Sequence, residues 1–238
     1  MKIKLKSWKL LQMLVVMRVI RSQSHLSKKP KNSLNKSSRM AFKIVILGSG
    51  KGSNARAILE AEATHKLGVV QTVAVLSDIQ DAPILELAAS FGKPFHSISS
   101  GKKRARLSDE ETRLFVEKIK SYNPDLIVLA GFMRIINPDF IEAFEGKIIN
   151  LHPSLLPHFP GIRSIEKAFE SSMQTTGCTV HWVTPALDAG PIIGQQSVRI
   201  EPSDSLESLT HKVHEAEHLL LPNVILGLST GAIKFTKK

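Results

Sequence analysis

The chain has 238 residues, 42% of them hydrophobic and 22% charged, which is enough for one ordinary domain or for one domain with an appendage. Its formal net charge is +11, but residues 1–40 hold 11 of the 32 Lys and Arg residues and none of the 21 Asp and Glu residues. The rest of the chain is therefore neutral overall, which argues against the general attraction to phosphate polymers that marks nucleic-acid-binding proteins.

Residues 1–39 are rich in Lys, Arg and Ser and contain one apolar patch, which is too short and too charged to span a membrane. We interpret them as a start-site artefact, with translation beginning at Met40, or as a basic, disordered extension. A transit peptide ranks second and a secretory signal last. The single cysteine, Cys178, excludes an intramolecular disulfide framework and suits a reducing compartment. We therefore predict a cytoplasmic protein, or an organellar one if residues 1–39 are a transit peptide.

The first predicted strand, Phe42–Leu47, runs into a Gly-rich loop at residues 48–54. A helix should follow, capped by Ser53 or Asn54 and with residues 55–63 in its body. Glycines let the backbone approach a ligand, and the free N–H groups of a helix start suit a phosphate. The spacing fits neither a dinucleotide fingerprint nor a P-loop, so a single phosphate is favoured. A Gly-rich turn without a ligand is the alternative.

Downstream, short apolar runs alternate with segments of helical spacing. Ser108, followed by three acidic residues, predicts a capped helix start. The predicted strands are 69–77, 94–97, 125–130, 147–151, 176–183 and 192–200, and the predicted helices are 82–91, 109–122, 138–144, 164–171 and 204–221. No repeat or linker divides residues 40–238. This alternation predicts an α/β fold with a parallel sheet and right-handed crossovers.

The strand at 147–151 carries the main candidate site. Asn150 and His152 are two residues apart, so both side chains point to the same face of the sheet. Pro153 lacks an N–H and stops the strand, which leaves both groups at its carboxyl end. Ligands bind at the carboxyl ends of strands in open parallel sheets. We therefore expect Asn150 and His152 to face a ligand crevice.

Asp188 lies on a later loop that the following Gly-Pro pair forces to turn, and we expect it to reach the same crevice. A carboxylate favours the charged form of a nearby imidazole, and an amide can donate to a developing oxyanion. No G-x-S-x-G segment and no zinc-type spacing occur, which leaves direct attack on a carbonyl by a bound substrate. Taken alone, His152 is equally compatible with a structural histidine. In phase with Asn150, it is better explained by catalysis.

Five segments together resemble the folate-dependent phosphoribosylglycinamide (GAR) formyltransferases of purine synthesis, over nearly all of residues 43–223. They are Gly50-x-Gly52-Ser53-Asn54, Ala130-Gly131-Phe132-Met133-Arg134-Ile135, Asn150-Leu151-His152-Pro153-Ser154-Leu155-Leu156-Pro157, Thr176-Gly177-Cys178-Thr179-Val180-His181 and Leu187-Asp188-x-Gly190-Pro191-Ile192-Ile193. The resemblance implies a formyltransferase catalytic domain at 40–238, with a Rossmann-like, mostly parallel sheet and helices on both faces. It also implies small-molecule substrates, GAR and 10-formyltetrahydrofolate as cosubstrate, and no metal, nucleic acid or membrane partner.

The resemblance also implies a role for individual residues. Its catalytic positions are Asn150, His152 and Asp188, its substrate-phosphate positions are Gly52, Ser53 and Asn54, and its ribose contact is Glu217. Its folate pocket is formed by Met133, Arg134, Ile135 and Ile136, and Asn150 also touches the formyl donor. The chain departs from the family pattern at Ser108, where a folate-contacting Arg is usual, and Arg104 or Arg106 is the expected substitute. A second departure is His158, at a position where Lys is common.

These residues predict that the GAR amine attacks the formyl carbon while Asn150 and protonated His152 stabilise the oxyanion and Asp188 orients His152. The first alternative is a formyltetrahydrofolate hydrolase, with water as the nucleophile at the same site. A second is formyl transfer to another amine, such as an amino sugar or an aminoacyl-tRNA. The third is a non-catalytic module that binds a nucleotide phosphate.

Overall fold

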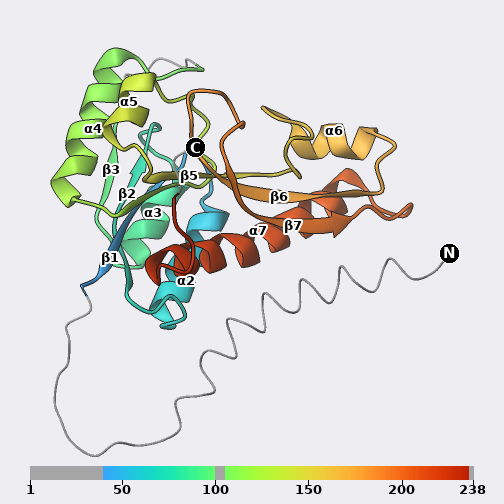
Figure 1. The fold of residues 1–238 in the computed structure, drawn as a ribbon, viewed down its shortest axis with the longest axis horizontal. Helices are drawn as coiled ribbons and strands as arrows, with labels where there is room; N and C mark the ends of the chain where they lie inside the picture. The colour runs from blue at the N-terminus through green and yellow to red at the C-terminus, as the bar shows by residue number, and fades with distance from the viewer. Residues whose placement is uncertain (1–39, 100–104, 236–238) are drawn as a thin grey trace, which may run out of the picture. The chain divides into compact units, whose positions relative to one another are not determined.

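Seven strands form one sheet in the computed structural model, which describes residues 40–99 and 105–235 (Figure 1). They are β1 (Phe42–Leu47), β2 (Val70–Ser77), β3 (Phe95–Ser97), β4 (Leu126–Leu129), β5 (Ile148–His152), β6 (Thr175–Trp182) and β7 (Ile192–Arg199). Their spatial order is β3-β2-β1-β4-β5-β6-β7. The pairs from β3 to β5 are parallel, and β6 runs antiparallel to both β5 and β7. The predicted α/β fold with a mostly parallel sheet is confirmed.

Helices cover both faces of this sheet, as predicted. They are α2 (Ser53–Ala63), α3 (Pro83–Ser90), α4 (Asp109–Tyr122), α5 (Pro138–Ala143), α6 (Ser164–Glu170) and α7 (Leu206–Ser229). One face packs against α2, α3 and α7, and the other packs against α4 and α5 (Figure 1). The short helix α6 packs against α7 through Ile165, Leu209 and Val213. Strands covered on both faces are apolar where they are buried, which explains the apolar runs Ile44–Leu47 in β1 and Leu126–Leu129 in β4.

The order of the strands creates the crevice. After β3 at one edge, the chain returns through α4 and adds β4 on the other side of β1. Open α/β sheets bind ligands at such a reversal, outside the carboxyl ends of the strands. Residues 48–54 follow β1, residues 130–137 follow β4, and β5 ends at His152. The loops that were predicted to hold ligands therefore leave neighbouring strands at the same edge of the sheet.

The predicted cap of α2 is wrong. The residue at the N-cap is Gly52, in the left-handed conformation with φ 76°, and no side chain caps the helix. A Cβ atom at Gly52 would lie 2.7 Å from a side-chain carbon of Ile84, so the loop crosses α3 too closely for another residue. Ser53 thus becomes the first helical residue, and the Asn54 side chain is free to bond elsewhere. The predicted Ser108 cap is confirmed, with a full capping box to Glu111.

The predicted end of the last helix is also wrong, because α7 continues through Pro222 to Ser229. Proline inside a helix removes a hydrogen bond and usually ends the helix. Here Leu221, Val224 and Ile225 are buried in the core on the face of the sheet that α2, α3 and α7 cover, and this burial offsets the cost of the proline.

The predicted tail, residues 1–39, lies outside the described residues, and so does Arg104. Within residues 40–99 and 105–235, no helix is long and apolar enough to cross a membrane. The described residues belong to one compact unit.

Candidate active site

Asn150 and His152 lie at the carboxyl end of β5, between the parallel strand β4 and the antiparallel strand β6. His152 is buried, whereas Asn150 is partly exposed. The pairing sets Asn150 opposite His181 on β6, and Asn150 Nδ2 lies 3.2 Å from His181 Nε2. Two polar side chains that share one face of a central strand therefore have a polar neighbour on the next strand.

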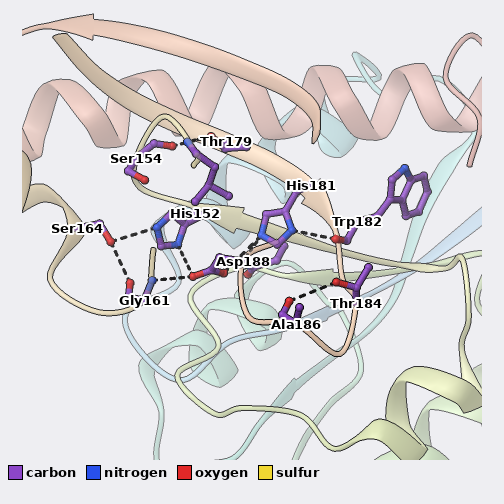
Figure 2. A network of polar contacts seen from close by, with 12 residues as sticks. His152, Ser154, Gly161, Ser164, Thr179, His181, Trp182, Thr184, Ala186 and Asp188 are labelled. Carbon is purple, nitrogen blue, oxygen red and sulfur yellow. Dashed lines mark hydrogen bonds and ion pairs between the residues drawn. The ribbon is translucent and has the colours of Figure 1, made fainter. Parts of the chain in front are cut away.

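Asp188 reaches these groups from the loop between β6 and β7 (Figure 2). Its carboxylate lies between two imidazoles, with Oδ2 3.4 Å from His152 Nδ1 and Oδ1 3.6 Å from His181 Nε2. The loop returns so close to β6 that a Cβ atom at Gly190 would lie 1.8 Å from the Trp182 carbonyl oxygen. Only glycine fits there, so Gly190 permits the approach that brings Asp188 to the site.

Both ring nitrogens of His152 face oxygen atoms. Nδ1 faces Asp188, and Nε2 lies 3.2 Å from Ser164 Oγ (Figure 2). Nε2 also lies 3.0 Å from the Phe159 carbonyl oxygen. A carbonyl and a carboxylate can only accept hydrogen bonds, and the Ser164 hydroxyl already donates to the Gly161 carbonyl. This arrangement suits a ring that carries a proton on each nitrogen.

The site holds Asp188 as an anion. Burial of the carboxylate acts to raise its pKa, but the hydrogen bonds from His181 and from the Gly161 amide, together with the nearby His152, outweigh that cost. The net result is a pKa of Asp188 below its ordinary value of 3.8. The Gly161 N–H donates to Oδ2 over 2.8 Å and belongs to the loop that also supplies the Phe159 carbonyl. Asp188 therefore stays ionised at neutral pH.

His181 was missed as a site residue, although its segment was predicted to be a strand. Its Nδ1 lies 2.9 Å from the Trp182 carbonyl oxygen, so Nδ1 carries a proton, and its Nε2 lies 3.2 Å from Asn150 Nδ2 and 3.6 Å from Asp188 Oδ1. His181 therefore lies beside both the Asn150 amide and the Asp188 carboxylate. Alternation along β6 would have put Thr179 and His181 on one face, but only the antiparallel pairing with β5 sets that face beside Asn150.

A second hydrogen-bond network holds the loop that follows β5. Thr179 Oγ1 donates to the Ser154 carbonyl over 2.6 Å and accepts the Leu156 N–H over 3.1 Å. Gln195, on β7, donates to the Leu156 carbonyl and to Thr179 Oγ1. These bonds fix the backbone just beyond His152, which stabilises the position of the imidazole.

The Gly-rich loop after β1 approaches α7. Asn54 Nδ2 donates to Glu217 Oε2 over 2.9 Å, and Asn54 Oδ1 is buried with no hydrogen-bond partner among the described residues. Glu217 is itself buried, and this burial raises its pKa to about 7, although the Asn54 hydrogen bond acts in the opposite direction. The structure thus brings together three of the predicted substrate-binding elements, namely Gly52, the start of α2 and Glu217.

The predicted folate-pocket residues take different positions. The Met133 side chain is 74% exposed, and Ile136 is buried. The backbone of Ile135 pairs with the 105–107 segment. The Arg134 side chain points inward and forms ion pairs with Asp78 and Glu111. Only the main chain and the apolar side chains of this loop are therefore available to a ligand.

Of the two predicted substitutes for the missing arginine, Arg106 is described and exposed, with its Nη1 3.5 Å from the Ile136 carbonyl oxygen. Ser108 is the cap of α4, which gives this serine a structural role. His158, where the family pattern has Lys, is exposed in the middle of the loop between β5 and α6. Among the residues that the structure describes, no group of His, Cys, Asp and Glu could hold a metal ion.

The Asn-x-His pair beside a buried carboxylate suits an enzyme that stabilises an oxyanion formed from a bound carbonyl group. The profile of the formyl transferase family matches residues 42–225. The chain is 40% identical to the phosphoribosylglycinamide formyltransferase of Escherichia coli (strain K12) over 192 residues, which are 80% of this chain and 89% of that protein. It is 35% identical to the Bacillus subtilis (strain 168) enzyme of the same name over 195 residues, 81% of this chain and 98% of that one.

A solved structure, glycinamide ribonucleotide transformylase 1 from Symbiobacterium toebii, superimposes with a TM-score of 0.78 at 32% identity. The match covers 87% of this chain and 96% of that one. The chain belongs to the formyl transferase family and, within it, to the phosphoribosylglycinamide formyltransferases.

Proposed function

We propose that this chain transfers the formyl group of 10-formyltetrahydrofolate to the amine of GAR and so produces formyl-GAR for purine synthesis. The observation that carries the proposal is the cluster of Asn150, His152 and Asp188 at the carboxyl end of β5, in a chain that is 40% identical to an enzyme named for this reaction. Family membership supports a folate-derived formyl donor and small-molecule substrates.

We assign the GAR phosphate to the start of α2. Gly52, Ser53 and Asn54 present backbone N–H groups that have no acceptor within the helix, and the positive end of the helix dipole favours an anion. Glu217 lies within hydrogen-bond reach of Asn54 and would accept hydrogen bonds from the ribose hydroxyls. The unpartnered Asn54 Oδ1 would gain a donor from the substrate.

We assign the formyl donor to the loop after β4. The main chain of residues 133–136 would hydrogen-bond the pterin, the side chains of Met133 and Ile135 would contact its rings, and Ile136, which is buried in the core, would support the loop. Arg134 contributes its main chain, because its guanidinium is engaged elsewhere. We assign the acidic tail of the folate to Arg106, which is exposed and whose Nη1 lies 3.5 Å from the Ile136 carbonyl oxygen.

In the reaction, the neutral GAR amine attacks the formyl carbon, a carbon–nitrogen bond forms, and the carbonyl oxygen becomes an oxyanion. The Asn150 amide and the His152 N–H donate to this oxygen, where a fixed donor is most effective. The bond to the folate nitrogen then breaks, and that nitrogen receives the proton lost by the amine. Ionised Asp188 holds His152 in orientation and balances its charge.

To donate a hydrogen bond to the oxyanion, His152 must exchange one hydrogen-bond acceptor for another. Its Nε2 is directed at the Phe159 carbonyl and Ser164 Oγ, and its Nδ1 faces Asp188. The substrate oxygen therefore has to replace the Phe159 carbonyl as the acceptor for Nε2. Phe159 has φ 52°, which is an unfavourable backbone conformation for an aromatic residue. A change in this conformation would lower the local backbone energy.

The proposal is tested by incubating the purified protein with 10-formyltetrahydrofolate, with and without GAR, and following deformylated folate. We expect deformylation that depends on GAR, together with formyl-GAR as the product. Equal rates with and without GAR, and release of formate, would identify a hydrolase instead. Binding of a phosphate ligand without turnover would favour the non-catalytic module.

Glu217→Gln is expected to weaken GAR binding and to stabilise the protein. An amide keeps the Asn54 contact but cannot accept two ribose hydroxyls as strongly, so the KM for GAR should rise about tenfold. Because the folded pKa of Glu217 is raised from 4.5 to about 7, the contribution of this residue to stability is fully present below pH 4.5 and is lost as the pH rises through 7. The variant lacks this loss, so its free energy of unfolding should exceed that of the wild type by up to about 3 kcal/mol at pH 8.

Urea unfolding at pH 5 and pH 8 measures the stability difference, and steady-state kinetics measure the KM. Glu215→Gln is the matched control, since Glu215 lies on the same helix with a side chain that is 65% exposed. A Glu217→Gln variant with unchanged KM for GAR would remove Glu217 from the substrate site.

A further inference from the structure

Arg134 lies on a ligand loop, yet its side chain is only 7% exposed. Nη2 donates to Glu111 Oε2 over 3.0 Å and to the Arg106 carbonyl over 2.9 Å. Nη1 lies 3.5 Å from Asp78 Oδ2. One guanidinium therefore joins the start of α4, the segment before it and the end of β2.

Asp78 extends these contacts to the Gly-rich loop. Its Oδ1 accepts the Ser49 hydroxyl over 2.5 Å, and Ser49 Oγ accepts the Met133 N–H over 2.8 Å. Met133 is the residue before Arg134, so the contacts close a circuit through Arg134, Asp78, Ser49 and Met133. The backbone adds a further link, because the Ser49 N–H donates to the Gly131 carbonyl over 3.0 Å.

This circuit is buried and charged. Asp78, Glu111 and Ser49 are 6%, 2% and 6% exposed, so two carboxylates share one guanidinium away from water. An isolated hydrophobic cluster would stabilise a loop at lower cost, because burying charges is expensive even when they are paired. A charged network has directional hydrogen bonds, and these fix the orientation of the groups that it joins.

Resting on the proposed function, we infer that Arg134 is a positioning residue for the formyl donor. Its guanidinium, through Asp78 and Ser49, holds the Met133 amide and the peptides that follow it against the Gly-rich loop. The donor pocket and the GAR phosphate loop are thereby kept in one fixed arrangement. Loss of the circuit should loosen the donor pocket more than the phosphate loop, because the start of α2 is also held by its own helix and by the Asn54–Glu217 contact.

Ser49→Ala is the first test, because it opens the circuit without leaving a charge unpaired. We expect the KM for 10-formyltetrahydrofolate and the Kd for tetrahydrofolate, measured by calorimetry, to rise about tenfold, the effect of losing one hydrogen bond to a charged group. The KM for GAR should change less. Unchanged donor binding would overturn the inference.

Arg134→Gln is the second test, combined with Glu111→Gln. The single variant removes the guanidinium that pairs with Asp78 and Glu111 and is expected to lower the thermal unfolding midpoint. The double variant removes one carboxylate and should recover much of that midpoint, while tetrahydrofolate binding stays at least about tenfold weaker. Recovery of donor binding together with the midpoint would reduce Arg134 to a purely structural role and overturn the inference.

Arg113→Gln is the matched control, since Arg113 pairs with Glu117 on the exposed side of α4, the helix that carries Glu111. It should alter neither the unfolding midpoint nor ligand binding.

The proposed function and the role of Arg134 would be refuted by different results. A wild-type protein that neither binds tetrahydrofolate nor shows GAR-dependent turnover would refute the proposed function. Variants that bind tetrahydrofolate like an active wild type would refute only the role of Arg134.

Discussion

Asn150→Ala is expected to lower kcat by about 10²–10³, the usual effect of losing one donor to an oxyanion. The KM values should change much less, because the interaction is strongest after the amine has attacked. The Asn150 side chain is only half-buried and its amide lies beside His181, so truncation should leave the fold intact. Single-turnover kinetics with saturating GAR and 10-formyltetrahydrofolate measure the chemical step directly.

His152→Ala should have an effect of the same order, for the same reason. Because Asn150 and His152 act on one oxygen, the double variant should lose less than the product of the two single losses. His211→Ala is the matched control, since this histidine lies on α7 with a side chain that is 74% exposed. Near-normal turnover in either Asn150→Ala or His152→Ala would remove that residue from the catalytic group.

The sequence predicted the strands well where burial alone decides the pattern. The apolar run Phe42–Leu47 is β1, residue for residue, and the strand carrying Asn150 lies within one residue of its predicted bounds. These strands are buried on both faces, so their local composition already specifies their position. The same holds for the Ser108 cap, because a capping box is a local pattern.

The features that the sequence did not predict depend on contacts between distant segments. Gly52 takes the cap of α2 because Ile84 of α3 leaves no room for a side chain. His181 joins the site only because β6 runs antiparallel to β5, which no local pattern records. Arg134 turns inward because Asp78 and Glu111 meet there from two other elements. Candidate catalytic residues could thus be found by motif, but their supporting residues could not.

Asp188→Asn is expected to lower kcat by at least about 10², as for other carboxylates that orient a catalytic imidazole. The amide keeps the size of the side chain but cannot balance a charged ring, and its NH₂ group would face His152 Nδ1 or His181 Nε2 as a donor. Substrate binding should be nearly unchanged, since Asp188 contacts the imidazoles and the Gly161 amide. Steady-state kinetics with both substrates varied would separate the two effects.

The pH dependence gives a second measure of Asp188. Its pKa is lowered below 3.8, so the ionised carboxylate contributes stability that is present above the unfolded value and is lost as the pH falls through the lower folded value. The stability difference between the wild type and Asp188→Asn should therefore be largest near pH 7 and should shrink toward pH 3. For the same reason, the acidic limb of the wild-type pH–rate profile should not be set by this carboxylate. An Asn variant with near-normal kcat would mean that His152 needs no anion beside it, and the oxyanion would then depend on Asn150 and an uncharged His152.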